Sequence, residues 1–244
     1  MNQETLEKQE LRSKSPEEET LESGDIEKNS PLKGYSYLEF VKIKDDGSGI
    51  FKREEEDKKE VNRERAAYLV NLFLGFDFVP PTVLRRIGEK YGSVQQFIEN
   101  GKVASMVQKE DIPKEELLKL NIFDYIINNG DRHKKNYLIR DGKIVAIDHG
   151  VAFSYYSGLS DHSKANWSRT MGVAISQEIK DKLALFVSSE SKGRILKDLL
   201  YELIDEKNVK LIFKRAEAIH DVISKDGSVS QTKLDDLSSG DFFK

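Results

Sequence analysis

The sequence predicts an α+β protein with a β-rich N-terminal lobe and a helical C-terminal lobe. Two β-rich segments flank a turn before residue 60, an apolar-rich run fills residues 117–127, and apolar residues recur at helical spacing after residue 176. A chain of 244 residues is long enough for one compact domain, or for two lobes around a cleft with a tail.

The composition argues against a membrane-spanning, a secreted or a disulfide-bonded protein. Hydrophobic residues make up 38% and charged residues 34% of the chain, and no apolar stretch approaches the roughly 20 residues that span a bilayer. The N-terminus lacks the basic and apolar regions of a signal peptide, and the chain has no cysteine for disulfides or thiolate metal sites. We therefore expect a cytoplasmic protein without integral membrane association.

Negative charge is concentrated at the N-terminus. Residues 1–30 contain nine Asp and Glu against four Lys and Arg, whereas the whole chain has a formal net charge of −4. The rest of the chain is thus nearly neutral and lacks the excess of positive charge that is typical of nucleic-acid-binding proteins. Because residues 1–30 also contain almost no aromatic or branched apolar side chains, we predict that they form a disordered acidic tail.

Residues 31–100 are predicted to form the N-terminal lobe. Residues 35–43 alternate in polarity, and residues 45–49 form a turn signal before a second strand at 50–52, so a β-hairpin is expected. The other elements expected in this lobe are a helix at 61–74 closed by Gly75, an extended segment at 79–84 that contains two prolines, and a strand at 94–98.

Residues 101–225 are predicted to form the C-terminal lobe, and residues 226–244 a loose polar tail. A buried helix is expected at 115–128, followed by a polar loop and a second hairpin whose strands are 137–140 and 143–147. Three further helices are expected near 176–187, 191–205 and 207–224, where apolar positions recur at helical spacing.

The residues best suited to chemistry lie in the polar loop and at the end of the second hairpin. Asp131 and Asn136 are in the loop, and Asp148 follows the apolar strand that the hairpin brings back beside it. Phosphoryl transfer needs an Asp that orients the attacking hydroxyl, and an Asn and a second Asp that bind Mg²⁺. Each residue alone could simply cap a loop or form a turn, but the set in this order indicates a phosphoryl-transfer site.

A phosphoryl-transfer site also needs a cation for the nucleotide phosphates and a carboxylate to hold that cation. Lys52, on the second strand of the first hairpin, and Glu64, on the following helix, are placed for these roles. Read alone, Lys52 could be a solvated strand lysine, and Glu64 is one of several nearby glutamates. The four histidines include no H-E-x-x-H spacing, which argues against a zinc hydrolase.

Several motifs resemble the phosphatidylinositol 3-/4-kinase-like catalytic domain, in particular the plant gamma-type 4-kinases and small bacterial relatives, and more distantly the HipA-like kinases. The motifs are G-I-F-K at 49–52, R-E-R-A-A-Y at 63–68, V-P-P-T at 79–82, G-S-V-Q-Q-F-I-E-N at 92–100, N-G-D-R-H-K-K-N at 129–136 and A-I-D-H-G at 146–150. The resemblance implies a two-lobed protein-kinase-like fold and covers roughly half of the chain.

The resemblance also implies roles for particular residues. Lys52 would contact the α- and β-phosphates of ATP and pair with Glu64, while Asp131 would orient or deprotonate the acceptor. Asn136 and Asp148 would hold Mg²⁺, and His133 would stabilise the transferring phosphoryl group. The backbone of Gln96, Phe97 and Ile98 would bind adenine, which would pack against Ile50, Val79 and Ile147.

The predicted function is a Mg²⁺- and ATP-dependent kinase that phosphorylates a hydroxyl, favouring a protein Ser or Thr. A lipid kinase is the first alternative, but only Lys164 and Arg169 are basic in residues 154–170, the expected substrate loop. The loop at 31–36, expected to cover the phosphates, has a single glycine, so transfer of AMP stays open. A catalytically weak binding module is the third alternative. Trp167 is either a packed anchor or a substrate contact.

Overall fold

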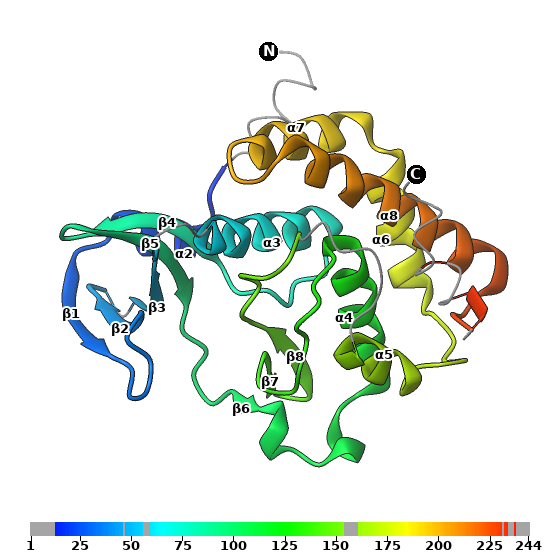
Figure 1. The fold of residues 1–244 in the computed structure, drawn as a ribbon, viewed down its shortest axis with the longest axis horizontal. Helices are drawn as coiled ribbons and strands as arrows, with labels where there is room; N and C mark the ends of the chain where they lie inside the picture. The colour runs from blue at the N-terminus through cyan, green and yellow to red at the C-terminus, as the bar shows by residue number, and fades with distance from the viewer. Residues whose placement is uncertain are drawn as a thin grey trace.

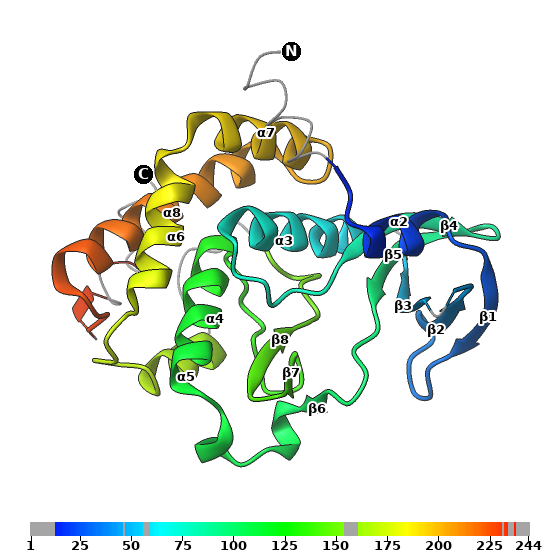
Figure 2. The same ribbon diagram turned by 180° about the vertical axis from the view of Figure 1, so that it is seen from behind.

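The computed structural model describes residues 13–45, 47–55, 59–153, 161–230, 232–233 and 237. Figures 1 and 2 show a β-sheet on one side of the molecule and a group of helices on the other, with helix α3 between them. Among the described residues, none of the helices is long and apolar enough to cross a bilayer. The two-part architecture agrees with the α+β prediction.

Five antiparallel strands form the N-terminal sheet in the order β1-β2-β3-β5-β4. Their bounds are β1 Ile26–Pro31, β2 Leu38–Ile43, β3 Gly47–Arg53, β4 Thr82–Ile87 and β5 Lys90–Gln96. The strands β2 and β3 confirm the first predicted hairpin, with Phe40 opposite Ile50 and Leu38 opposite Lys52. Since side chains alternate along a strand, Phe51 enters the core of the sheet while Ile50 and Lys52 point to its opposite face.

Helix α3 (Glu60–Leu74) confirms the predicted helix, and Gly75 ends it in the left-handed conformation at φ 69°. Its apolar residues do not belong to the small core of the sheet. They join the large core that the C-terminal helices build, with Ala67, Val70 and Leu74 almost fully buried there. Glu64 is therefore carried by a helix that is anchored in the C-terminal lobe.

The C-terminal lobe contains a three-stranded sheet, β6-β7-β8, and five α-helices within the described residues. The bounds are β6 Lys102–Val103, 3₁₀ turns at Ala104–Met106 and Lys109–Asp111, α4 Lys114–Ile127, β7 Tyr137–Arg140, β8 Lys143–Ala146, α5 Asp161–Ser168, α6 Gln177–Ser188, α7 Glu190–Tyr201 and α8 Glu206–Asp226. The predicted buried helix, second hairpin and three C-terminal helices are confirmed. Helix α4 is buried along most of its length, which explains its nearly continuous apolar run.

The prediction that residues 1–30 are disordered is wrong for the part that the structure describes. Residues 16–23 form helix α2 (Pro16–Ser23), and residues 26–31 form the edge strand β1. Leu21 is buried in the core of the sheet, and Glu18 is only 3% exposed. The composition of residues 1–30 does not predict this packing, because it depends on only a few side chains and on the pairing of one strand. Residues 1–12 lie outside the described part.

Two further predictions about loops need correction. The expected substrate loop at 154–170 contains helix α5, while residues 154–160 lie outside the described part. Trp167 on α5 is 1% exposed, which makes it a packed anchor. In the tail predicted to be loose, Val229 and Leu237 are each 1% exposed and belong to the large core.

Gly92 on β5 provides a test of the sheet that carries Lys52. A Cβ atom at Gly92 would lie 2.1 Å from the carbonyl oxygen of Lys52 on β3, so the two strands can approach only with glycine here. We expect Gly92→Ala to push β3 away and to lower the free energy of unfolding by about 1–3 kcal/mol. Urea unfolding followed by circular dichroism measures this change.

A matched control for this substitution lies in helix α7. A Cβ atom at Gly193 would meet only Phe213, at an ordinary 3.6 Å. Gly193→Ala is expected to raise stability by up to about 1 kcal/mol, because alanine favours helix more than glycine does. Equal effects of the two substitutions would contradict the close approach of β3 and β5.

Candidate active site

Lys52 joins the sheet to the C-terminal lobe through two carboxylates. Its Nζ lies 2.5 Å from Oε1 of Glu64 on α3 and 2.8 Å from Oδ1 of Asp148, which follows β8. The side chains of Lys52 and Glu64 are 13% and 6% exposed, whereas that of Asp148 is 52% exposed. The structure therefore brings together three residues that lie up to 96 positions apart in the chain.

This arrangement keeps both members of the buried pair charged. Burial alone would lower the pKa of Lys52, but the charges of Glu64 and Asp148 outweigh it and raise that pKa above its ordinary value. Burial would likewise raise the pKa of Glu64, but Lys52 and the hydrogen bond from His149 hold it well below its ordinary value. Lys52 thus offers a fixed positive charge of the kind that binds phosphate.

Glu64 uses its second oxygen to hold the segment that follows β8. The backbone N–H of His149 donates to Oε2 of Glu64 at 2.9 Å. The imidazole of His149 is fully buried, packs edge-on against Phe123 at 5.8 Å, and places Nδ1 3.5 Å from the same Oε2. Burial lowers the pKa of His149, although Glu64 opposes this change, so the ring is neutral near pH 7.

The predicted polar loop follows α4, which ends at Asn128 in the left-handed conformation. Within this loop, Nδ2 of Asn136 donates to the carbonyl oxygen of Asp131 at 2.8 Å, and the carboxylate Oδ2 of Asp131 lies 3.5 Å away. Nε2 of His133 lies 3.9 Å from the same Oδ2. The side chains of His133 and Asp131 are 36% and 46% exposed, so both can reach a substrate from solvent.

Arg132 is the buried centre of this loop, and its positioning role could not be predicted from the motif alone. Its guanidinium is fully buried and forms a paired contact with the carboxylate of Asp124 on α4, with Nε 2.9 Å from Oδ2 and Nη2 3.0 Å from Oδ1. Nη1 also donates to the carbonyl oxygens of Asn136 and Ile147. Arg132 thus fixes the loop and the end of β8 to the same helix.

The residues predicted to bind a divalent cation are brought to neighbouring positions. The backbone N–H of Ile147, next to Asp148, donates to the carbonyl oxygen of Asn136 at 3.1 Å. Asp148 has φ 59°, a conformation that is costly for a residue other than glycine and that is often found at functional sites. A carboxylate and an amide oxygen suit Mg²⁺, which is commonly bound by one or two carboxylates together with substrate phosphates.

In the segment predicted to bind adenine, two of the backbone N–H groups already form hydrogen bonds within the protein. The N–H of Gln96 donates to the carbonyl oxygen of Pro81 at 2.8 Å, and the N–H of Phe97 donates to that of Ser48 at 3.0 Å. These two N–H groups are already paired within the protein, and binding of adenine by the backbone of Gln96–Ile98 stays a prediction. Ile98 is the first residue of the segment beyond these bonds.

Two other residues predicted to pack against adenine, and the loop predicted to cover the phosphates, are described by the structure. Ile50 is on the same face of the sheet as Lys52, and Val79 is 4% exposed in the large core. The loop expected to cover the phosphates connects β1 to β2, with Gly34 at φ 89° and a hydrogen bond of 3.1 Å from the N–H of Tyr35 to the carbonyl oxygen of Leu32. These contacts make a short, closed turn without further glycines.

The sequence is similar to known kinases. Residues 83–166 match the family model described as phosphatidylinositol 3- and 4-kinase. A rice (Oryza sativa subsp. japonica) protein named phosphatidylinositol 4-kinase gamma 4 is 34% identical over 125 residues, which cover 43% of this chain and 22% of the relative. A Drosophila melanogaster protein named glycosaminoglycan xylosylkinase homolog is 33% identical over 112 residues, which cover 44% and 26%. The chain spans about a quarter of the length of these relatives.

Solved structures establish the fold. The structure of hydra Fam20 with sugar has a TM-score of 0.63 at 15% identity and covers 85% of this chain and 87% of that chain. The Golgi casein kinase with Mn and ADP bound has a TM-score of 0.57 at 16% identity, with coverage of 83% and 73%. The protein therefore has a kinase-like fold. Its central residues match the phosphatidylinositol 3- and 4-kinase family, as the motif resemblance predicted.

The pairing of Arg132 with Asp124 predicts a large effect on stability. Arg132→Met leaves the carboxylate of Asp124 buried without its positive partner, and we expect a loss of about 3–5 kcal/mol in the free energy of unfolding. Adding Asp124→Leu removes that unpaired charge and should recover part of the loss. A double-mutant cycle by urea unfolding measures both effects, and a single Arg132→Met variant as stable as the wild type would contradict this account.

The pair of Lys52 and Glu64 predicts a pH dependence of stability. Because the folded-state pKa of Glu64 is depressed, its contribution is present above the ordinary glutamate pKa of 4.5 and is lost as the pH falls below that value, where the unfolded chain takes up the proton first. The stability difference between the wild type and Glu64→Gln should thus be constant from about pH 6 to about pH 8 and shrink in acid. Urea unfolding at each pH tests this, with exposed Glu217→Gln as the control.

Proposed function

We propose that this protein is a kinase that uses Mg²⁺ and ATP to phosphorylate a hydroxyl group of a protein Ser or Thr. The observation that carries the proposal is the contact of Lys52 with both Glu64 and Asp148, beside the loop of Asp131 and Asn136. Catalysis of phosphoryl transfer depends mainly on positioning and on stabilisation of negative charge. A buried, fixed cation beside an exposed carboxylate supports that chemistry.

The proposed reaction assigns a task to each group. The acceptor oxygen forms a bond to the γ-phosphorus of ATP, the bond from that phosphorus to the β-phosphate oxygen breaks, and ADP leaves. Asp131 orients the acceptor hydroxyl and accepts its proton, while Lys52 binds the nucleotide phosphates. Asp148 and the amide oxygen of Asn136 would hold Mg²⁺, which supplies charge neutralisation for the phosphates when bound.

The choice of a protein acceptor has support from the C-terminal lobe. In the described part of the segment around α5, the basic residues are Lys164 and Arg169, and Nη2 of Arg169 already donates to the carbonyl oxygen of Lys109 at 3.2 Å. This offers little positive charge for an inositol phosphate headgroup. The name of the Golgi casein kinase, whose fold is similar, also points to a protein acceptor.

The proposal predicts loss of transfer when the acidic residues of the site lose their charge. The full chain would be incubated with Mg²⁺ and γ-labelled ATP, with dephosphorylated casein as the acceptor. We expect Asp131→Asn to lower the rate by about 10²–10⁴-fold, the usual contribution of a positioned acid–base group. Asp148→Asn should also lower the rate, because it removes the charge of a proposed Mg²⁺ ligand. Asp141→Asn, at an exposed hairpin turn, is the control and should keep the wild-type rate.

Two further arms separate the alternatives. Vesicles that contain phosphatidylinositol replace casein in one arm, and ATP labelled at the α-phosphate replaces the γ-labelled ATP in the other. Label in lipid alone would assign a lipid acceptor, and stable label from the α-phosphate would assign AMP transfer. Equal labelling by the wild type and both site variants would reject phosphoryl transfer by this site.

A further inference from the structure

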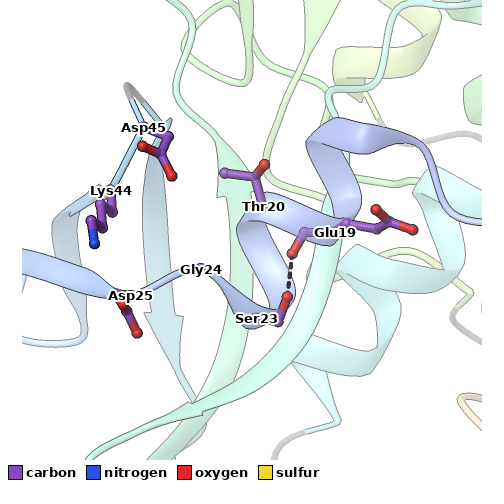
Figure 3. A pocket seen from close by; sticks show the side chains of 7 residues that line it. All are labelled: Glu19, Thr20, Ser23, Gly24, Asp25, Lys44 and Asp45. Carbon is purple, nitrogen blue, oxygen red and sulfur yellow. Dashed lines mark hydrogen bonds between the residues drawn. The ribbon is translucent and has the colours of Figure 1, made fainter.

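The segment from Lys14 to Asp25 packs against the N-terminal sheet, on the face that carries Phe51 and not Lys52. Helix α2 has a complete capping box, in which the N–H of Glu18 donates to Oγ of Ser15 and the N–H of Ser15 donates to Oε2 of Glu18, both at 3.2 Å. At its other end, Figure 3 shows the hydroxyl of Ser23 directed to the carbonyl oxygen of Glu19, at 2.9 Å.

The chain at the end of this helix lies close against the sheet, although a pocket beside it is lined by Thr20, Asp25 and Lys44 (Figure 3). A Cβ atom at Gly24 would lie 2.5 Å from Cγ2 of Ile43 on β2, so the chain passes close against the sheet. Leu21 is 2% exposed and contacts the core of the sheet. Arg85 on β4 donates through Nη1 to the carbonyl oxygen of Leu21 at 2.8 Å and to that of Gly24 at 3.2 Å. The segment is thus held by apolar burial and by a charged side chain.

Glu18 places a buried negative charge between this segment and helix α3. Its Oε1 accepts a hydrogen bond of 2.6 Å from Nη1 of Arg65, which also donates to the carbonyl oxygen of Thr82 on β4 at 2.6 Å. Burial and the charge of Glu18 together raise the pKa of Tyr68, one turn further along α3. A carboxylate that is 3% exposed needs such partners, because an unpaired buried charge is costly.

The position of Arg65 in the sequence links this contact to the active site. Arg65 follows Glu64 directly, so the same turn of α3 contacts Glu18 on one side and Lys52 on the other. A rotation of this turn that shortened or broke one contact would change the other. The bond from Arg65 to Thr82 also ties that turn to the sheet that carries Lys52.

We propose that Glu18 and Arg65 are positioning residues, through which the N-terminal segment sets the contact between Glu64 and Lys52. The inference rests on the proposed function only in taking Lys52 and Glu64 as the pair that serves the nucleotide phosphates. Glu18 touches no reacting atom, and it acts through α3. By this proposal, residues 13–25 help to position the contact between Glu64 and Lys52.

The chemical reactivity of Lys52 measures this effect without requiring any enzymatic activity. The ammonium group of Lys52 is 13% exposed and is held by the carboxylates of Glu64 and Asp148, so a loosened contact with Glu64 makes it more accessible to the reagent. Limited acetylation of the full chain with acetic anhydride, followed by mass spectrometry, gives the rate at Lys52. Lys119 is the internal reference, because it is 17% exposed and paired with Glu116 at 2.7 Å.

We expect Glu18→Gln and Arg65→Met to increase the rate of acetylation at Lys52 several-fold, with the rate at Lys119 unchanged. Glu17→Gln, which removes an exposed carboxylate from the same helix, should match the wild type. The value of kcat/KM for ATP should fall in the same variants that expose Lys52. An unchanged rate at Lys52 in folded Glu18→Gln would overturn the proposal.

The remaining outcomes are also decisive. If Lys52 and Lys119 both became more reactive, Glu18→Gln would have loosened the whole fold. The milder Ser15→Ala, which removes only the hydroxyl of the capping box, would then test the proposal. A rise at Lys52 alone in Ser15→Ala supports the proposal, and no change or a rise at both lysines rejects it. If Lys52 responds as expected but the wild type transfers no phosphate, the proposed function fails while the positioning role stands.

Discussion

The buried guanidinium of Arg132 is the interaction on which the active site depends. It forms an ion pair with Asp124 on the buried face of α4, and it donates to the carbonyl oxygens of Asn136 and Ile147. In turn, Nδ2 of Asn166 on α5 donates to the carbonyl oxygen of Arg132 at 3.0 Å. A planar group with five donors can hold several chain segments at once, which a lysine could not do. The loop and the strand end are aligned by this single side chain.

Much of the fold could be predicted because its elements have strong periodicity. The alternation before residue 53 and the apolar run of α4 follow directly from burial on one face or on nearly all faces. Lys52 and Asp148 could be proposed as site residues because phosphoryl transfer needs their charges in this order, whereas Glu64, one of several nearby glutamates, is distinguished by the motif resemblance. The structure brings these three into contact.

The features that escaped prediction depend on few side chains or on exact register. Helix α2 docks through Leu21 and the buried charge of Glu18, within a stretch whose average composition suggests disorder. The tail after α8 likewise contributes only Val229 and Leu237 to the core in its described part. Which N–H groups of the segment after β5 are free depends on pairing with Ser48 and Pro81, and periodicity alone does not determine that pairing.

The burial of α3 in the large core limits the conformations that the protein can populate. Withdrawing Glu64 from the cleft by swinging α3 outward would expose apolar side chains such as Val70 and Leu74, which are at most 1% exposed. Burial of each such side chain contributes about 1.5–3 kcal/mol. Exposing both would leave a withdrawn state in fewer than about one molecule in a hundred, since 1.4 kcal/mol corresponds to tenfold. An outward swing of α3 is therefore unfavourable, and the helix remains a fixed support for Glu64.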